Sequence, residues 1–160
     1  MRGKGFAAAV IAVAALVGAG CGGDDETPGG GEALTKQEWI AKADAICADA
    51  QERIQKLGDP GTDLSKLAEL TGDAKEILEA EVAAIRDLNP PPGDEQQIDA
   101  MLAQVENGSE ALEALIEAAT SGDISKLQEI TAEGSEFSKA SAEADRLASD
   151  YGLKECGTGV

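Results

Sequence analysis

The sequence predicts an all-α protein, an antiparallel up-down-up-down four-helix bundle over residues 34–160, behind an N-terminal leader of different composition. Apolar residues recur at spacings of three and four along four long segments, as on the buried face of an amphipathic helix. Glycine or proline ends each segment, and the short loops between them favour antiparallel neighbours. No stretch of useful length alternates apolar and polar residues with period two, so we expect no strands.

The first predicted helix begins at a capping box that runs from Thr35 to Glu38, in which each of these two side chains accepts the backbone N–H of the other residue. Leu34 and Trp39 flank the box as a hydrophobic staple. Gly58 supplies the left-handed residue that ends the helix.

Capping and helix-breaking residues of the same kind predict three further helices. The second begins at the N-cap Asp63 and ends before the prolines at 90–92, because proline lacks an N–H and disfavours helix in the preceding residue. The third runs from about residue 94 to Gly122, and the fourth from 123 to 151. Residues 63–71 resemble residues 123–131, which indicates either a duplicated helical hairpin or two helix starts with the same capping solution.

The N-terminal leader has the composition of a secretory signal peptide over residues 1–20. Arg2 and Lys4 precede an apolar run from 7 to 17, and three small residues follow before Cys21. The run is too short for a transmembrane helix, which needs about 20 residues. Residues 21–33 are rich in glycine and acids, and this composition is typical of a flexible tether.

The small residues before Cys21 resemble the lipobox of bacterial lipoproteins, in which the cysteine is diacylated and becomes the new N-terminus. Gly18 stands where the lipobox favours leucine, and Val17 lies one residue earlier. The resemblance implies lipidation of Cys21 and a protein held at the extracytoplasmic face of the cell membrane. An ordinary secretory signal followed by an incidental cysteine is the alternative.

The other two cysteines, Cys47 and Cys156, form an even pair that predicts one disulfide in an oxidising compartment, with two unpaired thiols as the alternative. The bridge would close a long loop, and the chain-entropy argument gives it roughly 4–5 kcal/mol. Cys47 lies in the middle of the first helix, whereas Cys156 follows the fourth. We therefore expect the fourth helix to end early or bend, and residues 153–156 to double back along the first helix.

Composition excludes several classes of function. A net charge of −18 argues against a nucleic-acid partner. The sequence contains no histidine, which removes Ser-His-Asp and Cys-His catalysis, histidine-ligated haem and the common histidine-dependent metal sites. Four aromatic rings are too few to build a sugar-binding cleft. We therefore predict no catalytic residue, no metal site and no cofactor; a hydrolase that works without histidine is a distant alternative.

Glu81 is the acidic residue that interrupts the apolar stripe of the second helix, amid Ile77, Leu78, Ala84 and Ile85. In a regular bundle, its height along the axis places it near Trp39 and Met101, and near a region of small side chains with hydroxyl groups. One interpretation is a pocket for a small polar or cationic ligand or a metal ion, lined by Glu81, Trp39, Ser109, Ser138 and Ser141. The other is tight packing, with Glu81 at the rim or hydrogen-bonded by Trp39 or Ser141.

The whole pattern resembles the uncharacterised small helical-bundle lipoproteins of high-GC bacteria. The residues that carry this resemblance are the cysteine-ended signal, Ala-Asp-Ala-Ile-Cys at 43–47, the prolines at 90–92 and Gly-Leu-x-x-Cys-Gly at 152–157. It implies a membrane-anchored domain that binds or scaffolds an envelope protein, without indicating which protein or the oligomeric state. A carrier or sensor that holds a small ligand near Glu81 is the alternative.

Overall fold

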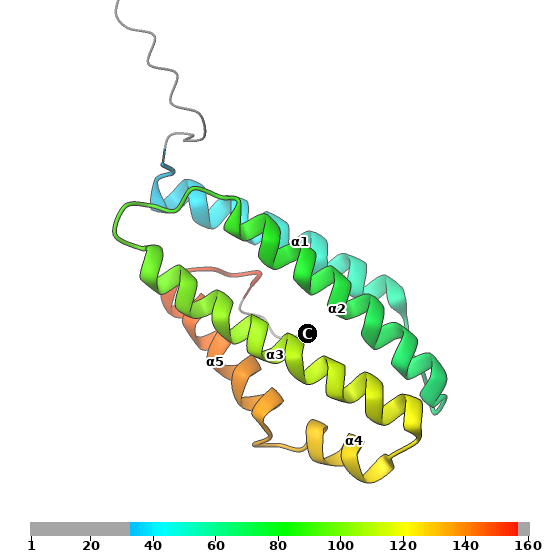
Figure 1. Ribbon diagram of the computed structural model, residues 1–160. Coiled ribbons are helices and arrows are strands. Elements are labelled where there is room, and N and C mark those ends of the chain that lie inside the picture. The colour runs from blue at the N-terminus through cyan, green and yellow to red at the C-terminus, as the bar shows by residue number, and fades with distance from the viewer. Residues whose placement is uncertain (1–32, 157–160) are drawn as a thin grey trace, which may run out of the picture.

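The computed structural model describes residues 33–156, and it folds this part of the chain into a helical bundle (Figure 1). The helices, in chain order, are α1 (Lys36–Leu57), α2 (Leu64–Arg86), α3 (Glu95–Ser121), α4 (Ile124–Thr131) and α5 (Glu136–Tyr151). Successive long helices run in opposite directions, and no strand occurs within residues 33–156. The predicted all-α class is confirmed. The predicted signal peptide, Cys21 and most of the tether lie outside the described residues.

The helices begin where their capping residues predict. Thr35 accepts the backbone N–H of Glu38, and the Glu38 carboxylate accepts that of Thr35, so the capping box is complete. Asp63 and Asp123 each accept N–H groups from the first turn of their own helices. The two similar segments thus share one capping arrangement. Beyond it they differ, because α2 continues for 23 residues and α4 ends after 8.

The prediction of one continuous fourth helix from 123 to 151 is wrong. Residues 132–135 divide it into α4 and α5. Gly134 adopts a φ of +79°, in the left-handed region that favours glycine, and Ser135 starts the new helix by accepting the N–H of Ser138. The chain is therefore interrupted in the middle of the predicted helix, and the helix does not end early, because α5 reaches Tyr151.

The C-terminal tail, residues 152–156, doubles back along α1 as predicted. Tyr151 packs edge-on against Trp39, with 5.3 Å between ring centroids, so α5 ends at the level of Trp39. From there to Cys47 is about 12 Å along a helix, a distance that five extended residues span. The Asp44 carboxylate holds the tail in place, because its Oδ1 accepts two consecutive tail N–H groups at 2.9 Å each.

The main core lies where α1, α2, α3, α5 and the tail meet. Trp39 is completely buried at its centre, and Leu102 of α3 and Leu153 of the tail pack into the same cluster. Helix α2 pairs with α1 and α3, and α3 pairs with α5, but the backbones of α1 and α5 do not pair. The tail occupies the space between them, so it completes the bundle.

Candidate functional site at Glu81 and the disulfide

Cys47 and Cys156 form a disulfide whose Cα atoms lie 5.1 Å apart, which confirms the predicted pairing. Cys47 is on the buried face of α1 with Ala43 and Ala50, and is itself 2% exposed. Cys156 is partly exposed at the end of the tail. The bond therefore ties the middle of the first helix to a segment 109 residues later.

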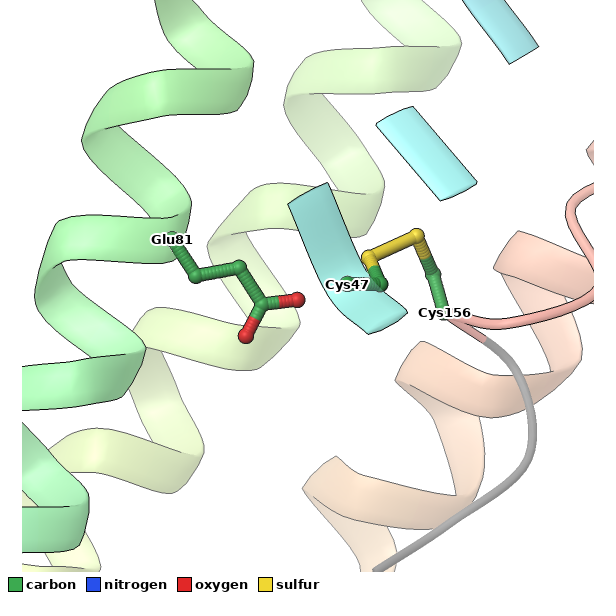
Figure 2. Close-up of side chains that lie close together, drawn as sticks. All are labelled: Cys47, Glu81 and Cys156. Atoms are coloured by element: carbon green, nitrogen blue, oxygen red, sulfur yellow. A yellow bond between two sulfur atoms is a disulfide. The ribbon is translucent and has the colours of Figure 1, made fainter. Parts of the chain in front are cut away.

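The Glu81 carboxylate extends from α2 toward this disulfide (Figure 2). One of its oxygen atoms and the two sulfur atoms all lie within 4.8 Å of one another. The side chain is partly buried, and no residue of the described part of the chain gives it a hydrogen bond or an ion pair. Because burial removes water without supplying a partner, it raises the pKa of Glu81 to about 7.

Glu81 separates two hollows of very different size. On the inner side, a cavity of about 30 Å³ lies against Glu81, Cys47 and Cys156, with room for about one water molecule. Its other lining residues are apolar: Val82, Ile85, Met101, Leu102, Val105, Ala144 and Ala148. On the outer side, an open groove of about 330 Å³ runs between α1 and α2, and its other charged residues are Asp49 and Arg53.

The structure does not assemble the predicted ligand pocket. Trp39 is in the main core, and its indole N–H has no hydrogen-bond partner within the described residues. Ser109 lines a different groove, Ser138 is partly buried near the start of α5, and Ser141 is exposed. None of the four lines either hollow beside Glu81, and neither Trp39 nor Ser141 donates a hydrogen bond to it.

For Ser138 and Ser141, the reason is the break before α5. One regular helix from 123 would place them level with Glu81, whereas the turn at 132–135 resets the register of every residue after it. Ala144 and Ala148 face the cavity instead of Ser138 and Ser141. Met101 lines the cavity as expected.

The nearness of the disulfide to Glu81 is a feature that the sequence analysis missed. Cysteine parity predicts the bond, but the position of Glu81 beside Cys47 depends on the register between α1 and α2. The sequence of the loop at 58–63, which joins the two helices, carries no signal for that register. Since both sulfur atoms are in a disulfide, neither is a thiolate available to bind a metal ion.

A second groove, of about 490 Å³, lies between α2 and α3. Its apolar lining consists of Leu78, Val82, Ala83 and Val105. Its charged lining consists of Lys75, Arg86, Glu79, Glu106, Glu110 and Glu113. Lys75 pairs with Glu79 and Glu113, and Arg86 pairs with Glu106, so acids of the groove already neutralise both cations.

No protein-family model matches the chain, and comparisons with curated proteins and with solved structures give no significant match. Within residues 33–156, every helix is too short or too polar to cross a membrane.

Proposed function

We propose that this protein is a lipid-anchored domain at the extracytoplasmic face of the cell membrane, where it binds and scaffolds an envelope protein. Three features support the location. The leader has the charge and apolar pattern of a secretory signal and ends in small residues before Cys21. The segment 21–33 has the composition of a spacer between an anchor and a domain. The disulfide is of a kind that persists in oxidising compartments.

The binding role rests on the groove between α2 and α3. Its apolar side chains form a surface on which one face of an amphipathic helix could pack. Four glutamates against Lys75 and Arg86 leave its rim net negative. A partner segment with apolar residues on one face and lysine or arginine at the edges would complement both properties, and we assign the groove to such a basic amphipathic segment of an envelope protein.

The carrier or sensor function receives less support. Pockets for small ligands usually have volumes of about 300–1,000 Å³. The inner cavity beside Glu81 has about 30 Å³, and its lining residues other than Glu81 and the cysteines are apolar. The groove of about 330 Å³ on the outer side of Glu81 is large enough for a small ligand, but it is open to solvent. The hydroxyl groups expected to contact a ligand lie elsewhere.

Site-specific photocrosslinking in the cell tests the binding role. A photoreactive residue replaces Ala83, which is exposed and lines the groove, and the matched control carries it at Ala48, an exposed position on α1 outside the groove. We expect a discrete adduct from position 83 that is absent from position 48 and lost with Glu110→Lys. Mass spectrometry should locate the crosslink in a basic amphipathic segment. Equal adducts at both positions, or an adduct insensitive to Glu110→Lys, would contradict the proposal.

Replacement of Cys21 tests the anchor separately. Cys21→Ala should leave an unprocessed precursor or release the protein from the membrane, as measured by cell fractionation and intact-mass analysis. A normally processed Cys21→Ala protein that stays in the membrane would refute lipidation at this residue.

A further inference from the structure

We infer that Cys47, Cys156 and Glu81 form a thiol–disulfide exchange site, which reacts with a dithiol and uses Glu81 as its proton donor and acceptor. This goes beyond the binding role and does not involve the α2–α3 groove. The observation behind it is the approach of an unpartnered carboxylate to a disulfide, with the three reactive atoms within 4.8 Å of one another.

The position of Glu81 is costly for the fold and useful for this chemistry. A carboxylate withdrawn from water without a partner destabilises the folded state when it is ionised. A disulfide that serves only as a structural link needs no acid beside it. Perturbed acids next to a reactive group are characteristic of sites that move protons, and the cavity between Glu81 and the sulfur atoms can hold a single bridging water molecule.

Burial of the two cysteines sets the order of bond breaking. Cys156 is partly exposed on the tail, while Cys47 is 2% exposed on α1. An incoming thiolate therefore reaches the Cys156 Sγ, and the Cys47 Sγ is the leaving group. The leaving sulfur is the one that α1 holds on the buried side, beside Glu81 and the inner cavity.

The reaction balances with one dithiol. Its thiolate bonds to the Cys156 Sγ, the Cys47–Cys156 bond breaks with its electron pair on Cys47, and the Glu81 carboxylic acid protonates that sulfur directly or through one water. The second thiol of the reagent then attacks the mixed disulfide, and its proton goes to the Cys156 sulfur that it displaces. The dithiol leaves as a disulfide, so two electrons pass to the protein and both cysteines become thiols.

After reduction, each of the two cysteine side chains has a polar neighbour. The Cys156 Sγ lies 3.6 Å from the carbonyl oxygen of Ala43, which can accept a hydrogen bond from the new thiol. Cys47 faces the Glu81 carboxylate that has just lost its proton. In the reverse reaction this carboxylate takes the proton back, and the Cys47 thiolate is then free to attack.

The electrostatic surroundings of Glu81 allow it to donate a proton when the disulfide is reduced and to accept one when the disulfide forms again. The residues of α3 and α5 that line the inner cavity are apolar, and Glu81 is the one carboxylate in the described residues that line it. The charged groups facing Glu81 are Asp49 and Arg53 on α1, in the open outer groove. Burial holds the pKa of Glu81 at about 7, so donor and acceptor forms coexist near neutral pH.

The test is the pH dependence of disulfide reduction in the full chain, with EDTA present to exclude metal ions. Dithiothreitol reduces the wild type, Glu81→Gln and the matched control Glu76→Gln, in which an exposed glutamate of α2 is replaced. Each rate is divided by the rate at which dithiothreitol reduces oxidised glutathione in the same buffer. The pH dependence that comes from ionisation of dithiothreitol itself then cancels. We expect the normalised rate of the wild type and of Glu76→Gln to fall at least tenfold as pH rises through about 7.

For Glu81→Gln we expect a flat profile, at least tenfold below the wild type at pH values under 6. A merely structural effect of Glu81 has the opposite sign: its ionisation destabilises the fold, so reduction through opening of the fold would become faster as pH rises through about 7. Two results would overturn the inference: a Glu81→Gln profile with the same inflection as the wild type, or a rate independent of dithiothreitol concentration. The latter means that reduction requires prior unfolding.

Discussion

The hydroxyl group of Tyr151, the last residue of α5, donates a 2.8 Å hydrogen bond to the carboxylate of Asp94, just before α3. The same ring packs edge-on against Trp39 of α1, and the Lys36 ammonium lies 3.9 Å from its centroid. One side chain thus connects three helices at the end of the bundle where the tail begins its return.

The Tyr151 phenol should resist ionisation in the folded protein. Burial, and then the hydrogen bond to the Asp94 carboxylate, raise the pKa of Tyr151 well above its usual value. Above about pH 10 the unfolded chain releases this proton and the folded chain keeps it, so stability should fall as pH rises further. Tyr151 is the single tyrosine, so tyrosinate absorbance reports on it alone. Reversible titration near pH 10 without loss of helix would contradict the expectation, and Asp94→Asn should lower the midpoint.

Glu81→Gln should stabilise the protein in a pH-dependent way. In the unfolded chain this carboxyl ionises near pH 4.3, whereas burial raises its folded-state pKa to about 7. Stability is therefore lost as pH rises between these values, by on the order of 2–3 kcal/mol. Urea unfolding should show Glu81→Gln more stable than the wild type at pH 8 and equal to it at pH 4. Glu76→Gln, an exposed control, should match the wild type at both; equal stability of all three at pH 8 would disprove the effect of burial.

Asp44→Ala should loosen the tail. The change removes the acceptor for the N–H groups of Lys154 and Glu155, at a cost of about 1–2 kcal/mol. Urea unfolding measures the loss of stability, and hydrogen exchange should show faster exchange at these two amides. Asp49→Ala removes an exposed carboxylate elsewhere on α1 and should change stability by less than about 0.5 kcal/mol. Unchanged exchange in Asp44→Ala would mean that the disulfide and Leu153 hold the tail by themselves.

Replacement of Gly134 and of Gly108 by alanine should change the stability of the protein in opposite directions. A Cβ at either Gly134 or Gly108 would meet no atom within 4 Å, so packing does not distinguish them. Gly134 has a φ of +79°, and alanine there should cost about 1–2 kcal/mol. Gly108 lies within α3, where alanine should gain about 0.5–1 kcal/mol. Thermal unfolding of the two variants checks this; stabilisation by Gly134→Ala would show that residues 132–135 do not need a left-handed residue.

Local signals in the sequence predicted most of the fold. Thr35, Asp63 and Gly58 act within one helical turn, so their effect on the chain is visible without knowledge of its neighbours. The interruption at 132–135 carries a local signal too, a glycine followed by a serine cap. This signal is ambiguous, because Ser135 and Ser138 are equally compatible with a row of small residues at the centre of a long helix.

The surroundings of Glu81 required information that is not local. Apolar neighbours on α2 were enough to place its carboxylate among buried side chains. The residues opposite it depend on where α5 starts and on how α1 slides along α2. The tail reaches Cys47 because α5 ends level with Trp39. That level depends both on where α5 starts and on how α1 is positioned along α2.

The covalent link also determines how the domain would respond to mechanical load. Tension applied between the two ends of the chain passes from Cys47 directly to Cys156, because the covalent bond is the shorter path. The chain between the two cysteines, which are 109 residues apart in sequence, cannot be stretched while the bond is intact. The helices within it, α2, α3, α4 and α5, therefore carry none of the tension applied at the chain ends. Among residues 33–156, only the stretch before Cys47, which includes the first half of α1, can extend. A pull applied at the two ends of the chain would in this way leave the α2–α3 surface folded.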